Sequence, residues 1–235
     1  KATGNSYGSG MKTFIHLGKR EPDYRSLMSL QQDFTLDGVT IPVSRLVIAD
    51  QTHSRQVHIC SEADCGAGLG NKPQIPIVDG LITNIPNQFL LIRTADCTPV
   101  VLTDNKQMVV AALHSGREGT RKNIVDEAVR LMKARFGCQA ENIIAYIGAV
   151  ISYPHYQVSA EIYEEFIETT SSAGFSHKTD LERHLDIRHI IFQQLIKAGI
   201  PFRNIENIHH CTFSNPDYHS FRREGTHNRQ INLVG

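Results

Sequence analysis

Short apolar runs recur through the first half of the chain and predict buried strands. Valine, isoleucine and leucine dominate these runs, and runs of this length and composition are typical of strands in a buried sheet. The expected strands cover Ser44–Ala49, Gln56–Cys60, Phe89–Ile92, Pro99–Leu102 and Met108–Leu113. The segment Gly66–Pro76 holds three glycines and two prolines, which indicates a loop.

The pattern changes period after residue 120, where apolar positions recur at helical spacing. Ile124, Ala128, either Leu131 or Met132, and Arg135–Phe136 recur at helical spacing, and Gly137 stands where a C-terminal cap belongs. Further elements are expected as a strand over Ile143–Ile151, a helix over Glu161–Thr169 with N-cap Ser159, a helix over Leu181–Ala198 with N-cap Asp180, and a strand over Asn204–Thr212. Strands in the first half and alternating elements in the second predict a mixed α/β layered domain.

Composition narrows the classes of function. The 24 basic and 24 acidic side chains cancel, which excludes a generally basic nucleic-acid binder and a self-repelling disordered chain. No apolar run approaches the ~20 residues of a membrane span, so we expect no membrane partner. The five cysteines are an odd number without a CxxC pair, which favours a reducing cytoplasm. Because the chain does not begin with Met, we expect a short segment upstream of residue 1.

Three strand ends carry side chains that suit a metal. His53 follows the strand around residue 47, and Cys97 and His114 end two strand-like segments 17 residues apart, which a hairpin would bring together. Two histidines and one cysteine suit catalytic zinc, which keeps a fourth position open to polarise a substrate oxygen or to activate water. Spacing does not place His53 beside the other two. A small buried Cys97 and a merely hydrogen-bonded His114 remain the alternative.

The order and spacing of several motifs resemble one family over most of the chain. The chain resembles the YfiH-type family, also labelled multicopper polyphenol oxidase or laccase-like. The matching residues are Gln51–Ser54, Asp79–Thr83, Thr94–Pro99, His114–Gly116, Ile147–Gly148, Tyr156–Val158, Cys211–Thr212, Ser220–Gly225 and Arg229–Gln230. The glycine-rich stretch from Gly4 to Gly18 matches the family's beginning only loosely.

The resemblance implies a single-domain α/β/β/α sandwich with mixed sheets over residues 1–235 and one metal site at His53, Cys97 and His114. It implies a zinc-dependent purine nucleoside phosphorylase that cleaves adenosine, inosine, guanosine or methylthioadenosine with phosphate and also deaminates adenosine. Copper occupancy stays open, because a blue-copper site also accepts two histidines and one cysteine. The several His-x-His pairs of a multicopper oxidase are missing from the sequence, which argues against a trinuclear copper cluster.

Five further residues are candidates for catalysis or phosphate binding. Asp96, beside Cys97, is a candidate proton carrier, with a turn or supporting carboxylate as the alternative. Arginine offers a planar donor fork to an anion, and the candidates are Arg117, Arg222, Arg223 and Arg229. The alternative for the last three is a solvated basic stretch. Arg117 and the following glutamate stand where many relatives carry Trp and a basic residue, so Arg117 would have to supply the charge that binds an anion.

Two other functions stay open at this point. Cys97 with His114 would also suit the nucleophile and base of a metal-free cysteine hydrolase. A metal-binding protein without turnover is the second alternative. The preferred nucleoside, the native metal and the oligomeric state are not determined by these patterns.

Overall fold

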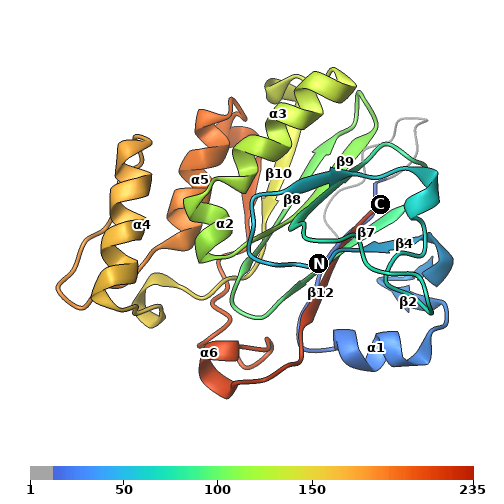
Figure 1. The fold of residues 1–235 in the computed structure, drawn as a ribbon, viewed down its shortest axis with the longest axis horizontal. Helices are drawn as coiled ribbons and strands as arrows, with labels where there is room; N and C mark the ends of the chain where they lie inside the picture. Colours follow the sequence, from blue (N-terminus) through green and yellow to red (C-terminus); the bar gives the residue numbers. More distant parts are fainter. Residues whose placement is uncertain (1–12) are drawn as a thin grey trace.

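The five strands expected from the apolar runs belong to two stacked sheets, three in the interior and two at an edge. The structure is a computed structural model and describes residues 13–235, so the glycines at positions 4, 8 and 10 lie outside the described residues (Figure 1). The larger sheet runs in the order β11 (Ile205–Asn207), β10 (Ile143–Ile147), β8 (Thr98–Asp104), β9 (Val109–Ser115), β6 (Gly80–Thr83) and β5 (Val57–Ile59). The smaller sheet runs β1 (Ile15–Leu17), β12 (Gln230–Val234), β7 (Phe89–Thr94) and β4 (Leu46–Ile48).

Helices cover the outer faces of the two sheets. Figure 1 shows α3, α4 and α5 together on one side of the molecule and α1 on the opposite side. The helices are α1 (Tyr24–Leu30), α2 (Arg117–Arg121), α3 (Ile124–Phe136), α4 (Ala160–Ser172), α5 (Ile187–Lys197) and α6 (Phe221–Glu224), and β2 (Phe34–Leu36) pairs with β3 (Val39–Ile41) beside α1. The resulting α/β/β/α sandwich with mixed sheets is the expected fold class.

Strand alternation divides the core into three layers. In β8, Leu102 faces the layer under α3–α5, whereas Val101 faces the layer between the two sheets. In β7, Leu90 points into the same inter-sheet layer, and Leu91 faces the layer beside α1 and the β2–β3 hairpin. All seven residues of β8 and all seven of β9 are buried, which explains why these strands read as continuous apolar runs.

Several local predictions hold. α3 ends at Gly137, whose φ of 69° gives the left-handed cap that glycine adopts without strain. α4 begins after Ser159, whose side chain accepts a hydrogen bond from the Ile162 N–H. Among the helices described for residues 13–235, none combines the length and apolar character that crossing a bilayer requires.

Other predictions are wrong. The helix expected from Leu181 begins at Ile187, and its N-cap is Asp186 instead of Asp180. The Asp180 carboxylate instead accepts hydrogen bonds from the Tyr153 hydroxyl and from the His184 backbone. The strands expected over 143–151 and 204–212 are shorter, because β10 ends at 147 and β11 at 207. β12 was not among the predicted strands, although all five of its residues are buried in the small sheet.

Candidate metal centre

The structure brings the side chains of His53, Cys97 and His114 together at one end of the sheets. The β8–β9 hairpin places Pro99 opposite His114, so Cys97, just before β8, lies beside His114. His53 lies in the loop after β4, and its Nε2 is 3.9 Å from Cys97 Sγ. One ligand atom from each of the three residues lies within 4.8 Å of the other two. His53 is exposed, Cys97 is half-buried and His114 is buried, so the cluster opens to solvent on the His53 side.

Asp79, fully buried just before β6, holds two of the three ligands in place. Its carboxylate accepts hydrogen bonds from the backbone N–H groups of Thr52 (3.0 Å), His53 (2.9 Å) and Ser54 (2.8 Å), and from the Ser54 hydroxyl (2.7 Å). These bonds stabilise His53 at a φ of 61°, a left-handed conformation that non-glycine residues rarely adopt. The same carboxylate accepts from His114 Nδ1 at 2.7 Å, which leaves Nε2 of that ring available as a ligand.

Charge within the cluster favours a thiolate beside an imidazolium in the metal-free protein. Burial alone would raise the pKa of the Cys97 thiol, but His114, and then His53, outweigh burial and lower it to about 6. Burial alone would lower the pKa of His114, but Cys97 and Asp79 raise it to about 9. Burial also opposes ionisation of Asp79, yet the bonds from His114 and Ser54 hold the pKa of this carboxyl well below its usual range.

Gly116 leaves the space that the ligands occupy. A Cβ atom at this position would lie 2.6 Å from Cys97 Sγ and 3.3 Å from His53 Cδ2. The φ of Gly116 is −81°, which any residue adopts, so the need for glycine here is one of space. A side chain at this position would displace the ligands.

The three residues fit a transition metal by the chemistry of their donors. A thiolate and two imidazole nitrogens match the three-ligand set of catalytic zinc and also suit copper. The ring of His114 is oriented by a carboxylate, as metal-bound histidines usually are. The cluster can therefore hold one metal ion with room for a further ligand on the exposed side.

Asp96 has both carboxylate oxygens engaged by neighbouring chain segments. Oδ1 accepts from the Thr212 hydroxyl and Oδ2 from the Arg222 N–H, both at 2.7 Å. The residue has a φ of 96° and is buried. Asp96 thus ties the turn that carries Cys97 to the start of α6, which corresponds to a supporting carboxylate.

Tyr156 interacts with two of the candidate arginines and is influenced by the charge of Cys97. Burial raises the pKa of Tyr156, the charge of Arg117 works against this rise, and the Cys97 thiolate adds to it, so the phenol lies within electrostatic range of both. The Arg222 guanidinium lies over the Tyr156 ring at 5.3 Å and donates to the Gln157 carbonyl. Arg117 Nε is buried and makes no hydrogen bond among residues 13–235, but it lies 3.5 Å from Glu118 Oε1 in an ion pair.

Arg229 and Arg223 differ in what their guanidinium groups can still bind. Arg229 donates through Nη1 to the carbonyls of Thr226 at 2.8 Å and Asn228 at 2.7 Å, which leaves other donors of its fork, and burial lowers its pKa while Cys97 opposes this shift. The Arg223 guanidinium instead donates to the carbonyls of Thr212, Phe213 and Tyr218 and pairs with Glu224. The Arg223 guanidinium therefore stabilises the chain around α6 and has no donor left for an anion.

Asp79 and Tyr156 were not among the site residues predicted from the sequence. Both stand inside motifs that carried the family resemblance, yet neither was given a role there. An aspartate directly before the apolar run Leu81-Ile82 was the available signal for Asp79, because a buried carboxylate needs several partners. No local signal distinguished Tyr156.

Comparisons with known proteins match most of the chain. Residues 6–235 match the family model described as "Multi-copper polyphenol oxidoreductase laccase". A Bacteroides thetaiotaomicron protein named purine nucleoside phosphorylase is 30% identical over 205 residues, which are 85% of this chain and 76% of that protein. The Bacillus subtilis purine nucleoside phosphorylase YlmD is 26% identical over 230 residues, 96% of this chain and 81% of the relative.

Solved structures support the fold. The Bacillus licheniformis hypothetical protein YfiH superposes with a TM-score of 0.76 at 29% identity, covering 82% of this chain and 74% of that one. Geobacillus stearothermophilus YlmD gives the same TM-score at 25% identity, with coverage of 83% and 74%.

Proposed function

Because the chain belongs to the multi-copper polyphenol oxidoreductase laccase family, we propose that it is a zinc-dependent purine nucleoside phosphorylase of one domain. The observation that carries the proposal is the cluster of His53, Cys97 and His114 with its open side. The names of the relatives from Bacteroides thetaiotaomicron and Bacillus subtilis support the reaction class. The proposed partners are a purine nucleoside and inorganic phosphate.

In this proposal, the three residues hold the metal and the rest of the site aligns them. Asp79 fixes the backbone of His53 and orients the ring of His114. When bound, zinc would supply Lewis-acid stabilisation of negative charge on a substrate oxygen. Asp96 acts as a positioning residue, since its oxygens already hold Thr212 and Arg222.

Phosphate is proposed to bind between the arginines on the open side. Arg117 Nε makes no hydrogen bond and pairs only with Glu118 at 3.5 Å within the described chain, and Arg229 retains part of its donor fork beyond the bonds from Nη1 to two carbonyls. Arg222 retains part of its donor fork beyond the bond to Gln157. Arg223 is left out of this set because all three of its guanidinium nitrogens are engaged, by backbone carbonyls and by Glu224.

The reaction itself needs only positioning and charge stabilisation. A phosphate oxygen forms a bond to C1′ of the nucleoside while the bond from C1′ to the purine nitrogen breaks. The electron pair of that bond goes to the purine, which takes up the proton that the phosphate loses and leaves as the free base. The second product is ribose 1-phosphate, or its 5-methylthio derivative when methylthioadenosine is the substrate. We propose adenosine, inosine, guanosine and methylthioadenosine as substrates, and adenosine deamination as a second activity. The five free cysteines of the described chain suit a cytoplasmic location.

A panel assay tests the proposal. Zinc-loaded protein is incubated with each purine nucleoside, with and without phosphate, and the products are separated by chromatography. We expect phosphate-dependent release of free base, lost in His53→Ala. Base release without phosphate, or none with any nucleoside, would contradict the proposal. Inosine formed from adenosine reports the deaminase activity separately.

A metal-free cysteine hydrolase is the second candidate, because Cys97 and His114 form a thiolate–imidazolium pair. Metal analysis separates the two functions. Stoichiometric zinc that is lost in Cys97→Ala supports the phosphorylase, whereas activity in metal-free protein that alkylation abolishes supports the hydrolase. Stoichiometric copper with oxidation of a polyphenol would support the oxidase function that the family description names.

A further inference from the structure

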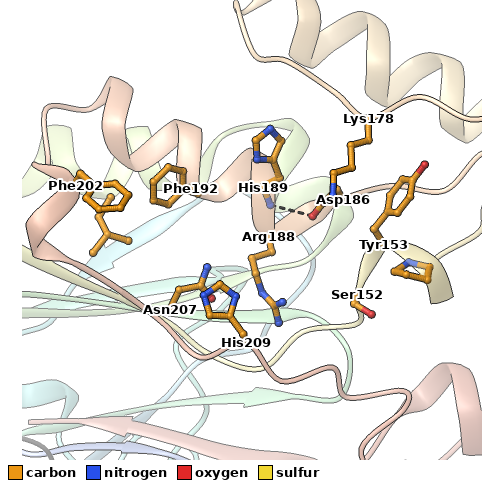
Figure 2. Close-up of a pocket in the computed structure, with 12 residues that line it drawn as sticks. Ser152, Tyr153, Lys178, Asp186, Arg188, His189, Phe192, Phe202, Asn207 and His209 are labelled. Atoms are coloured by element: carbon orange, nitrogen blue, oxygen red, sulfur yellow. Dashed lines mark hydrogen bonds and ion pairs between the residues drawn. The ribbon is translucent and has the colours of Figure 1, made fainter.

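A second hollow, separate from the metal cluster, lies between the start of α5, β11 and the loop at Ser152–Pro154. Its volume is about 630 Å³, which is within the usual range for a small-molecule site. His53, Cys97 and His114 are not among its lining residues. Figure 2 shows Arg188 pointing into the region between Asn207 and Ser152, with Phe192 and Phe202 to one side.

Two buried polar atoms in this hollow lack partners. Arg188 Nε and Asn207 Oδ1 have no hydrogen-bond partner among residues 13–235. Arg188 uses one terminal nitrogen to donate to the His210 carbonyl at 2.7 Å, which leaves other donors of its fork free. Buried polar groups are almost always paired, so a free donor and a free acceptor in one hollow indicate a missing polar ligand.

The charge of the lining favours an anion. Lys178 and Arg188 carry positive charge, and the rings of His189 and His209 also line the hollow. Asp186 is the one acidic residue of the lining, and it is already engaged: its carboxylate accepts from the His189 N–H at 3.1 Å and lies 3.8 Å from Lys178 Nζ. Arg188 forms no ion pair in the described part of the chain, and Asp186 acts on it only at longer range.

One wall of the hollow is aromatic and unusually open. The rings of Phe192 and Phe202 pack edge to face with centroids 5.8 Å apart, and Phe202 is 74% exposed. A phenylalanine this exposed at the rim of a hollow offers a face for a planar ring. The Asn207 side-chain oxygen is an acceptor that an exocyclic amine of such a ring would satisfy.

We propose that this hollow binds a nucleoside monophosphate, with the phosphate on Arg188 and Lys178 and the base beside Phe192 and Phe202. The charges of Arg188 and Lys178 favour an anionic group in the ligand, and the aromatic wall favours a planar ring. The Asn207 oxygen favours a base that carries an amino group. The site is distinct from the metal cluster, whose proposed substrates are a nucleoside and inorganic phosphate as separate molecules. A negative result for this site would therefore leave the phosphorylase proposal unaffected, and the reverse also holds.

Calorimetric titration of adenosine 5′-monophosphate into the zinc-loaded protein, in phosphate-free buffer, tests this site. We expect binding of one equivalent. Arg188→Met keeps the apolar stem and removes the donors, and Phe202→Ser alters only an exposed ring; each should weaken binding about tenfold or more. Cys97→Ala, in the metal cluster, should bind the nucleotide as the wild type does. Arg130→Met, on the exposed face of α3, is the matched control for losing a surface arginine.

The probes separate the parts of the ligand. Adenosine and inorganic phosphate, titrated alone, should each bind this site about tenfold more weakly than the nucleotide or worse. Absence of nucleotide binding at millimolar concentration would overturn the proposal. So would binding that persists in Arg188→Met and disappears in Cys97→Ala, because the nucleotide would then occupy the metal cluster. Equal affinity for inorganic phosphate, unchanged in Phe202→Ser, would overturn the assignment to a nucleotide.

Discussion

The substitution Asp79→Asn tests whether this carboxylate organises the metal centre. The asparagine side chain would keep one oxygen, which can still accept from Thr52 N–H and the Ser54 groups now bonded to Oδ1. Its amide nitrogen would replace Oδ2 and face the N–H of His53 and Nδ1 of His114. The amide N–H of the asparagine would then face the backbone N–H of His53, so two donors would oppose each other. The contact with His114 reverses, so the ring proton moves to the nitrogen that should bind the metal.

Two altered contacts in a fully buried position set the magnitude. Each unsatisfied or reversed bond costs about 1–3 kcal/mol, which together lowers the free energy of unfolding by about 2–6 kcal/mol. Loss of a carboxylate that orients a metal-bound histidine weakens metal affinity about 10–100-fold. We expect both effects, because Asp79 supports the His53 backbone as well as the His114 ring.

The assay is zinc affinity by competition with a chromophoric chelator, together with thermal unfolding. Asp104→Asn is the matched control: the buried Asp104 carboxylate accepts from the N–H groups of Lys106 at 2.9 Å and Gln107 at 3.1 Å, and it belongs to no metal cluster of the described residues. It should leave zinc affinity unchanged. If Asp79→Asn binds zinc within about twofold of the wild type, the role assigned to this carboxylate is refuted.

Three further outcomes follow from the same geometry. Gly116→Ala should lower zinc affinity in the chelator assay, because its methyl group would lie 2.6 Å from Cys97 Sγ; unchanged affinity would contradict this packing. In metal-free protein, alkylation of Cys97, followed by peptide mass spectrometry, should accelerate as pH rises through a midpoint near 6, since His114 favours the thiolate; a midpoint above ~8, as in a free thiol, would argue against the pair. Arg229→Met should raise KM for phosphate about tenfold with zinc content unchanged, whereas Arg130→Met should alter neither.

Much of the layered core could be predicted, because its strands are buried on both faces. β8 and β9 appear as unbroken apolar runs for this reason, and α3 has both a clear helical period and a glycine cap. The start of α5 could not be predicted, because Asp180 and Asp186 are equally good caps locally. Tertiary contacts decide between them: Asp180 is engaged by Tyr153, and Leu181 is 97% exposed.

Part of the site could likewise be predicted from local patterns, whereas the rest depends on contacts between residues far apart in the sequence. A hairpin predicts that Cys97 and His114 meet, because both flank paired strands. His53 follows a strand of the other sheet, and only the family resemblance linked it to them before the structure was known. The bond from its backbone to Asp79 crosses 26 positions of sequence and leaves no local pattern. Likewise, Arg222 and Arg223 are neighbours on one short helix, and only their three-dimensional contacts separate an open donor fork from a structural one.

Phosphorus NMR of the reaction mixture tests the central claim most directly. Zinc-loaded protein, adenosine and inorganic phosphate should yield a new sugar-phosphate resonance, that of ribose 1-phosphate, in step with free adenine measured by chromatography. The signal should vanish in His53→Ala, which removes one proposed ligand, and persist in Arg130→Met. If free base appears without ribose 1-phosphate, or if His53→Ala forms it at the wild-type rate, the phosphorylase assignment at this metal centre is contradicted.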